Sequence, residues 1–349
     1  MIVLFPTYAR RLAGENLWRA TVAGMVTRPL PTTSRRRVLA LAVLRRLLDL
    51  SDHQLQSEVF QRRANAFLFQ RVAGEPVRVA IAGRLLDVGL TDRVGHFHSQ
   101  IDLDESTLAA ANRLSYQASL TGPDQLGDSL LSPAASTGKA AGGTIHLIGE
   151  EGLSVISDID DTVKVTEVAN RRELLANTLV REFSAVPGMV DVYDTWLRAG
   201  AAFHYVSASP WQLATCLDGF LHASGLPAGS MHLKLFRLKD STPLRRLPSR
   251  KRSKRRIIEQ IMADFPRRRF LLVGDSGERD PELYAAIAKR NPRQIVGIGI
   301  RQVAGHAPAK KTRARLERIR HRLPPEMMLI FSEPAELASW SNQAARRGL

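Results

Sequence analysis

Residues 153–162 place three carboxylates directly after a run of apolar residues. Asp158, Asp160 and Asp161 lie within four positions of one another. Clustered carboxylates are costly unless a cation or hydrogen bonds compensate them. Because a helix cap would need only one acid, this group indicates a site for chemistry.

Two further apolar runs end in polar side chains. Ser207 follows residues 203–206 and precedes a helix start, where backbone N–H groups and the helix dipole favour a phosphate oxygen. A serine N-cap followed by proline would look the same. Asp275 and Asp280 bracket a loop after residues 270–273, and Gly274 is expected to permit a tight turn there. Hard oxygen ligands in this arrangement suit Mg²⁺.

A lysine lies between the second and third of these sites. Lys254 belongs to a basic run over residues 250–256, in which a lone lysine would be surface charge by default. Only its place in the order of the whole set singles it out.

The elements around these residues alternate between strand and helix. Residues 144–149, 153–160, 203–209, 269–276, 294–300 and 327–331 have strand-like patterns, and residues 189–199, 255–263 and 310–323 have helical ones. This alternation predicts an α/β fold with a parallel sheet and helices on both faces. Since active sites of such sheets lie beyond the carboxyl ends of the strands, we expect the polar side chains to meet there.

The preceding part of the chain has a different pattern of apolar and polar residues. Residues 77–103 alternate as strands do, residues 36–50 have a helical pattern, and residues 91–97 resemble a turn and strand of transthyretin-like or carboxypeptidase-regulatory β-sandwich modules. Residues 121–143 are rich in Gly, Ser, Pro and Ala. We therefore predict a β-rich, sandwich-like domain with a helical insertion over 1–120, a linker over 121–143, and a catalytic domain over 144–349.

The order of the motifs gives a more specific prediction. DxDxT, a strand-terminal serine, a lysine and GDxxxxD resemble the four motifs of the haloacid dehalogenase superfamily. Over residues 150–303 the chain resembles the actin-patch phosphatidate phosphatase catalytic-domain family, through the segments SDIDDTVKVT, YVSASPWQL, FLLVGDSG, DPELY and GIRQV. Ser253 and Ala208 depart from residues common in that family, and neither is a predicted catalytic group.

The resemblance implies a Rossmann-like parallel sheet and a Mg²⁺-dependent phosphatase that converts phosphatidate to diacylglycerol. Asp158 would be the nucleophile that forms an aspartyl-phosphate, and Asp160 the general acid and base. The metal set would comprise Asp158, Asp160 through its main-chain carbonyl, Asp275 and Asp280, with Asp280 supporting either the lysine or the metal's water shell. Substrate contacts would come from Thr162, Ser207, Arg252 and Lys254, and Thr162, like Asp161, is expected chiefly to order the loop.

Composition limits the partners and the compartment. The 50 basic and 34 acidic side chains give a net charge of +16, which would attract phosphate-rich partners, including an anionic membrane surface. An arginine-rich genome would give the same charge to a protein without such a partner. A single cysteine, Cys216, excludes an internal disulfide. No apolar run reaches the ~18 residues of a membrane span, and the N-terminus lacks a basic region before its apolar residues. These features predict a cytoplasmic protein, with peripheral membrane contact as an option.

Other functions remain open from the sequence. The alternative to a phosphatidate phosphatase is a haloacid-dehalogenase-type phosphatase for a soluble phosphorylated metabolite or protein. A non-catalytic membrane-binding or nucleic-acid-binding adaptor would be expected to lack Asp158, Asp160 or Asp275, and all three are present. Metal-dependent nucleases also combine acids with basic charge, but the nucleophilic DxDxT strand end argues against one. The sequence leaves the oligomeric state and the role of the N-terminal domain open.

Overall fold

A computed structural model describes residues 1–108, 112–120, 140–167, 171–234, 250–303 and 309–348. The chain divides into two compact units. One consists of residues 1–149 with the short segments 212–218 and 229–231, and the other contains the remaining residues from 150 onward.

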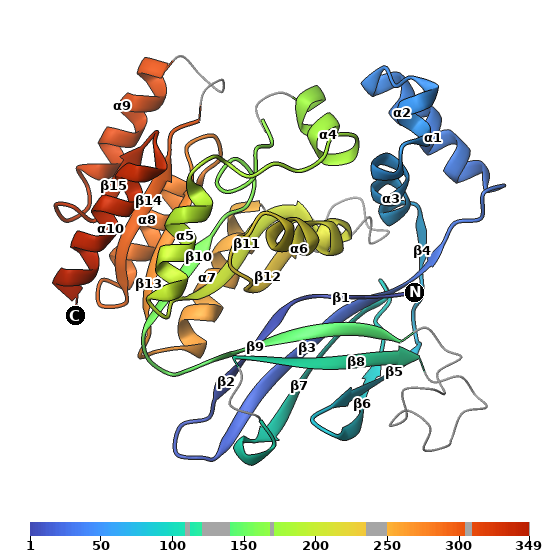
Figure 1. The fold of residues 1–349 in the computed structure, drawn as a ribbon, viewed down its shortest axis with the longest axis horizontal. Coiled ribbons are helices and arrows are strands. Elements are labelled where there is room, and N and C mark those ends of the chain that lie inside the picture. The colour runs from blue at the N-terminus through green and yellow to red at the C-terminus, as the bar shows by residue number, and fades with distance from the viewer. Residues whose placement is uncertain (109–111, 121–139, 168–170, 235–249, 304–308, 349) are drawn as a thin grey trace. The chain divides into compact units, whose positions relative to one another are not determined.

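The first unit is built on a mixed sheet in the order β1-β3-β2-β9-β8-β5-β6, with β4 and β7 also paired to β3 (Figure 1). Most pairs are antiparallel, and β2 and β9 run parallel. Alternating apolar side chains such as Val22, Val79, Leu103 and Ile145 form its core. The strands are β1 (Ile2–Leu4), β2 (Thr7–Arg11), β3 (Leu17–Pro29), β4 (Phe69–Arg71), β5 (Pro76–Ile81), β6 (Arg84–Leu90), β7 (His96–Asp104), β8 (Arg113–Leu120) and β9 (Ala141–Ile148).

Helices interrupt this sheet between β3 and β4. They are α1 (Arg35–Leu48), α2 (Asp52–Gln56) and α3 (Glu58–Phe67), and a short 3₁₀ helix covers Glu105–Thr107. Ser51 caps α2 with a capping box and Ser57 accepts a hydrogen bond from the backbone N–H of Phe60 at the start of α3, so local sequence accounts for both starts.

Two predictions for this region are wrong. Residues 144–149 were expected in the parallel sheet, but β9 pairs with β2 and β8 of the mixed sheet, because an apolar strand pattern does not specify a partner. The end of the predicted linker is also a strand from Ala141 on, and Gly143 is needed there because a Cβ atom would come within 2.3 Å of the Tyr116 ring. The rest of that segment, 121–139, lies outside the described residues.

The second sheet has the order β12-β11-β10-β13-β14-β15. Its pairs β11–β10, β10–β13, β13–β14 and β14–β15 are parallel. The prediction of an α/β fold with a parallel sheet is thus confirmed. The strands are β10 (Leu153–Ser157), β11 (Ala202–Pro210), β12 (Ser230–Lys234), β13 (Arg269–Asp275), β14 (Ile295–Arg301) and β15 (Met328–Phe331).

Helices cover both faces of this sheet, as alternation along β11 shows. The Phe203 ring lies 5.5 Å from that of Tyr193 in α5, whereas His204 points to the other face, 6.0 Å from the ring of Phe265. The helices are α4 (Arg171–Leu179), α5 (Met189–Arg198), α6 (Ala214–Ala223), α7 (Arg250–Asp264), α8 (Asp280–Arg290), α9 (Ala309–Arg320) and α10 (Pro334–Gly348), with a 3₁₀ helix at Trp211–Leu213.

Candidate active site

The three polar strand ends meet at one edge of the parallel sheet. β10 lies between β11 and β13, and Ser157 at its end is in register with Tyr205 and Val273. Asp158 follows β10 at once, Asp275 ends β13, and Ser207 lies near the end of β11. The shared direction of the strands therefore brings side chains more than 100 positions apart into one site.

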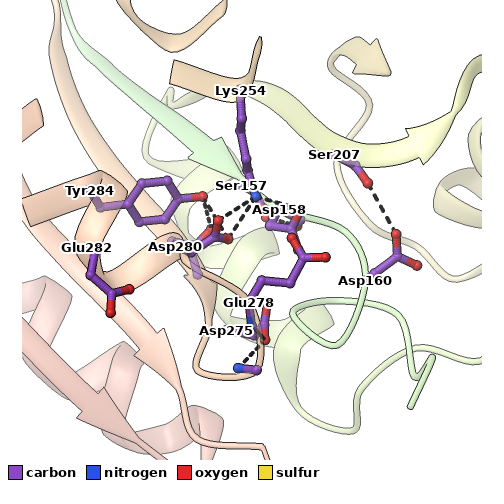
Figure 2. Close-up of polar contacts among 12 residues, drawn as sticks. Ser157, Asp158, Asp160, Ser207, Lys254, Asp275, Glu278, Asp280, Glu282 and Tyr284 are labelled. Carbon is purple, nitrogen blue, oxygen red and sulfur yellow. Dashed lines mark hydrogen bonds and ion pairs between the residues drawn. The ribbon is translucent and has the colours of Figure 1, made fainter. Parts of the chain in front are cut away.

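Lys254 links two aspartates in the centre of this site (Figure 2). Its Nζ donates to Asp158 Oδ1 at 2.9 Å and to both carboxylate oxygens of Asp280 at 2.8 Å. The Tyr284 hydroxyl donates to Asp280 Oδ2 at 3.3 Å from one helical turn further along α8. Lys254 thus holds the predicted nucleophile and the last predicted acid in one ion-paired group.

This group is almost entirely shielded from water. Asp158, Asp275 and Asp280 are each 2% exposed, and Lys254 is 7% exposed. Burial raises the pKa of Asp158 well above its usual value, although Lys254 opposes the shift. Burial would lower the pKa of Lys254, but Asp158 and Asp280 outweigh it and the pKa is raised, so Lys254 stays charged.

Asp275 adds a third carboxylate to the cluster. Its Oδ1 accepts hydrogen bonds from the backbone N–H groups of Gly277 at 2.6 Å and Glu278 at 3.1 Å. Burial, and after it the nearby Asp280, raise the pKa of Asp275 to about 7. A carboxyl group in this position binds protons unusually well and would bind a metal cation for the same reason.

The donor set fits a divalent metal ion. Asp158, Asp275 and Asp280 each offer one oxygen, and these oxygens lie within 4.8 Å of one another. Asp158 Oδ2 and Asp275 Oδ2 are buried and have no hydrogen-bond partner among the described residues. Since both Asp280 oxygens contact Lys254, the two free oxygens of Asp158 and Asp275 are the better ligands.

Asp160 belongs to a second group of side chains. Its Oδ2 accepts hydrogen bonds from Ser207 at 3.1 Å and Ser209 at 2.5 Å. Its Oδ1 lies 2.9 Å from Lys164 Nζ and accepts a 2.9 Å hydrogen bond from the Thr166 hydroxyl. The predicted acid and the predicted phosphate-binding serine are therefore in direct contact, as Figure 2 shows for Ser207.

The surroundings of Asp160 favour its ionised form. Burial acts to raise its pKa, but Lys164 and the hydrogen bonds from Ser209, Lys164 and Thr166 together lower it below the usual value. Asp158 and Asp160 are thus shifted in opposite directions. In this arrangement Asp160 has the lower pKa of the two and gives up its proton first. Protonation of a leaving group by Asp160 needs the opposite, with Asp160 protonated while Asp158 is ionised.

The loop that carries these aspartates is fixed by its own backbone. Asp161 has φ of 54°, and its Oδ1 accepts from the backbone N–H groups of Thr166 and Glu167 at 2.8 Å. Its carbonyl accepts from Arg301 Nη1 at 2.7 Å. These bonds suit the loop-ordering role expected for Asp161. Thr162 is buried, and its hydroxyl has no hydrogen-bond partner within the described segments.

Gly274 has a role other than the predicted turn. Its φ is not positive, and a Cβ atom there would lie 2.6 Å from Asp280 Oδ2 and 2.8 Å from Tyr284 Cε2. The prediction of a tight turn was therefore wrong. Glycine is required because the side chains of α8 approach the β13 backbone closely.

The sequence did not identify several partners of these acids. Lys164 and Thr166 follow Asp160 in the same loop, and Tyr284 is four residues after Asp280, which is one helical turn. Ser209 lies two residues after Ser207. Among these residues, only Tyr284 could have been found from the sequence, because its helical spacing places it next to Asp280. Arg252, a predicted substrate contact, lies in α7, but its side chain is outside the described part of the chain.

Residues 153–302 match a family described as "Phosphatidate phosphatase APP1, catalytic domain". This segment belongs to the APP1 catalytic-domain family. The resemblance predicted from the motifs is confirmed, and the matched segment contains every predicted site residue.

Two curated relatives each match a little under half of the chain. Phosphatidate phosphatase APP1 of Saccharomyces cerevisiae is 35% identical over 162 residues, or 45% of this chain. An uncharacterized protein of Schizosaccharomyces pombe is 34% identical over 169 residues, or 47% of this chain. Each match spans 27% of the relative's length. A solved carbohydrate esterase from Cellvibrio japonicus, aligned over 97% of this chain and 96% of its own, has 10% identity and a TM-score of 0.22, too low to carry an argument.

Proposed function

We propose that this protein is a phosphatase that hydrolyses the phosphomonoester of phosphatidate through an aspartyl-phosphate at Asp158. The observation that carries the proposal is the buried Asp158 carboxylate, which contacts Lys254 through one oxygen and has the other without a partner among the described residues. The match of residues 153–302 to the APP1 catalytic domain, and the similarity to the yeast phosphatidate phosphatase APP1, support phosphatidate as the substrate.

The proposal includes a fold assignment. The strand order, with β10 central and the acids at its carboxyl edge, is consistent with a Rossmann-like sheet of the haloacid dehalogenase type. For the first unit, its mixed sheet leads us to retain the proposal of a sandwich-like module. The proposed chemistry depends on the side chains of the site and not on either fold name.

In the first chemical step, an Asp158 carboxylate oxygen attacks phosphorus. An O–P bond forms, the bond from phosphorus to the glycerol oxygen breaks, and the leaving oxygen takes a proton from Asp160. Water then attacks the aspartyl-phosphate and gives a proton to Asp160, so that phosphate leaves and Asp158 is regenerated. Ser207 and Lys254 would hold phosphoryl oxygens, because a hydroxyl and a buried ammonium stabilise the charge that moves onto them.

Asp160 must be protonated before it can act as the acid. In the structure its Oδ2 accepts hydrogen bonds from Ser207 and Ser209, and both favour the carboxylate. A phosphoryl group that accepted the hydroxyl hydrogen of Ser207 would remove one of these bonds. We propose that substrate binding thereby raises the pKa of Asp160 and prepares it to donate.

Asp158 and Asp275 would hold Mg²⁺, together with the main-chain carbonyl of Asp160. When bound, this cation would neutralise charge on the phosphoryl oxygens and favour the ionised form of the nucleophile. Asp280, which contacts Lys254 through both oxygens, is better suited to orienting the lysine than to direct ligation.

A lipid substrate requires access to a membrane. Across the described residues, none of the helices combines the length and the apolar character needed to cross a bilayer. We propose a cytoplasmic protein that meets its substrate by peripheral contact, to which the net charge of +16 would contribute.

Phosphate release from phosphatidate-containing vesicles tests the proposal. We expect release by the wild type that requires Mg²⁺ and is lost in Asp158→Asn, with Asp191→Asn, an exposed aspartate on α5, as the matched control. A soluble phosphomonoester is assayed alongside. Turnover of the soluble compound alone would retain the phosphatase and reject the lipid substrate, and folded, metal-supplied protein that hydrolyses neither would favour the adaptor.

A further inference from the structure

Helix α1 has an unusual composition for a helix on the surface of a small unit. Its sequence, RRRVLALAVLRRLL, contains five arginines and no acidic residue. The arginines are grouped at the two ends, Arg35, Arg36 and Arg37 before the apolar centre and Arg45 and Arg46 after it. A helix of 14 residues is about 21 Å long, too short to span a bilayer but long enough to lie on one.

One face of α1 is held by the first unit. Leu48 is buried, and Arg37 Nη1 donates to Asn65 Oδ1 of α3 at 2.7 Å. After the helix, Leu50 is buried as well, and Arg45 pairs with Asp52 at 2.9 Å. These contacts fix which side of α1 faces outward.

The outward side exposes large apolar side chains. Val38, Leu39, Val43 and Leu47 are 59%, 67%, 48% and 58% exposed. Leu39, Ala42, Val43 and Arg46 follow the i, i+3, i+4, i+7 spacing of a single helix face, and Val38 and Leu47 flank it. Arg35, Arg36 and Arg46 are exposed on the same side. Scattered exposed leucines are ordinary on protein surfaces, but four large apolar side chains on one 14-residue helix are not.

We propose that the exposed face of α1 binds an anionic lipid surface, with its apolar side chains in the headgroup boundary and its arginines against lipid phosphates. Apolar side chains interleaved with basic ones, without acids, are the pattern of helices that lie in a membrane interface. The inference deepens the proposed function and rests on it, since a lipid substrate is what requires a phosphatase to dock on a membrane.

Other occupants fit this face less well. A second copy of the chain would bring its own Arg35, Arg36 and Arg46 against those of the first, with no acidic residue on α1 to pair with them. Nucleic acid would satisfy the arginines, but its phosphates would leave Leu39 and Val43 without an apolar partner. A lipid surface satisfies both kinds of side chain.

Flotation of the full chain with vesicles tests the proposal without catalysis. The vesicles contain phosphatidylcholine alone, or phosphatidylcholine with phosphatidylserine, an anionic lipid that is not a phosphomonoester. We expect binding only to the anionic vesicles, weakened by salt. The double variant L39E/V43E should bind the anionic vesicles at least about tenfold more weakly than the wild type. The variant R35Q/R36Q/R46Q should bind roughly 100-fold more weakly, since each arginine contributes about fivefold.

Leu90→Glu is the matched control, because Leu90 on β6 is also 67% exposed and lies off the helix. Circular dichroism and thermal unfolding verify that each variant is folded. Wild-type binding that L39E/V43E leaves unchanged, or that L90E weakens equally, would overturn the proposal. So would a wild type that does not bind anionic vesicles, or a dimer in solution that L39E/V43E converts to monomer.

The result is separable from the proposed function. If α1 is the docking helix, L39E/V43E retains wild-type turnover of a soluble phosphomonoester, or of phosphatidate dispersed in detergent, and loses turnover on vesicles. If the proposed function fails instead, no variant or substrate shows turnover, while vesicle binding by the wild type is unaffected.

Discussion

Replacing Gly274 by alanine perturbs the site through a single methyl group. The added Cβ would lie 2.6 Å from Asp280 Oδ2, 2.8 Å from Tyr284 Cε2 and 3.0 Å from Asp280 Cβ. Asp280 cannot turn away freely, because both of its carboxylate oxygens accept from Lys254 at 2.8 Å. Either α8 moves away from β13, or the Lys254–Asp280 pair is distorted.

The expected cost follows from this geometry. Inserting a methyl group into a packed core costs typically 1–3 kcal/mol, and the fixed neighbours favour the upper half of that range, about 2–3 kcal/mol of unfolding free energy. Since Lys254 also contacts Asp158, a displacement near 1 Å would reach the nucleophile and could lower turnover by about 100-fold.

Urea unfolding and phosphate release measure the two effects. Gly219→Ala is the matched control, because Gly219 lies in α6, is exposed and has no atom within 4 Å of its added Cβ. That variant should be more stable by about 0.5–1 kcal/mol, with unchanged activity. A Gly274→Ala protein with wild-type stability and turnover would refute the close packing of β13 and α8.

Three further predictions concern charge. Lys254→Met leaves buried carboxylates without their cation and should cost about 3–5 kcal/mol of stability, whereas the exposed Lys289→Met should change it by less than about 0.5 kcal/mol. Asp275, with a pKa raised to about 7, loses its contribution to metal-free stability as pH rises from about 4 to 7, so Mg²⁺ should raise the melting temperature more at pH 8 than at pH 5. Burial and then Arg113 lower the pKa of His146 to about 4. The folded protein holds His146 neutral, so the stability that this gives is fully present above the unfolded pKa near 6.5. As pH falls from 6.5 to 4, the unfolding free energy of the first unit should decrease by up to roughly 3 kcal/mol, and His146→Gln should remove that decrease.

Each of these has a result that would contradict it. Lys254→Met and Lys289→Met of equal stability would mean that the carboxylates are not paired as described. A Mg²⁺ effect on melting that is the same at pH 5 and pH 8 would show that Asp275 does not exchange a proton for the metal. An unaltered acid transition in His146→Gln would place the titrating group elsewhere.

The sequence predicted the parallel sheet well because its evidence was local. Apolar strands that end in Asp158, Ser207 and Asp275 require only the strand direction to bring those side chains together. Which strands pair with one another was harder to predict. Strand β9 has the same apolar pattern as a core strand of the parallel sheet, and only its pairing with β2 and β8 assigns it to the mixed one.

Within the site, the sequence predicted the residues that belong to a motif, but it did not predict the side chains that hydrogen-bond or ion-pair with them. The contacts of Asp160 with Lys164 and Ser209 depend on the fold of one loop and on its approach to β11. Gly274 shows a related limit, since glycine in a sequence does not reveal whether it serves a turn or a close approach. The opposite pKa shifts of Asp158 and Asp160 likewise depend on burial, which spacing does not give.

The central claim is that Asp158 itself takes up the phosphoryl group. The most direct measurement is to mix the enzyme with Mg²⁺ and phosphatidate, quench with acid, reduce any acyl phosphate with borohydride, and sequence the peptides by mass spectrometry. Our account predicts homoserine at position 158, with Asp160, Asp161 and Asp275 unmodified. Substrate turnover without modification at 158, or with modification at another aspartate, would contradict it.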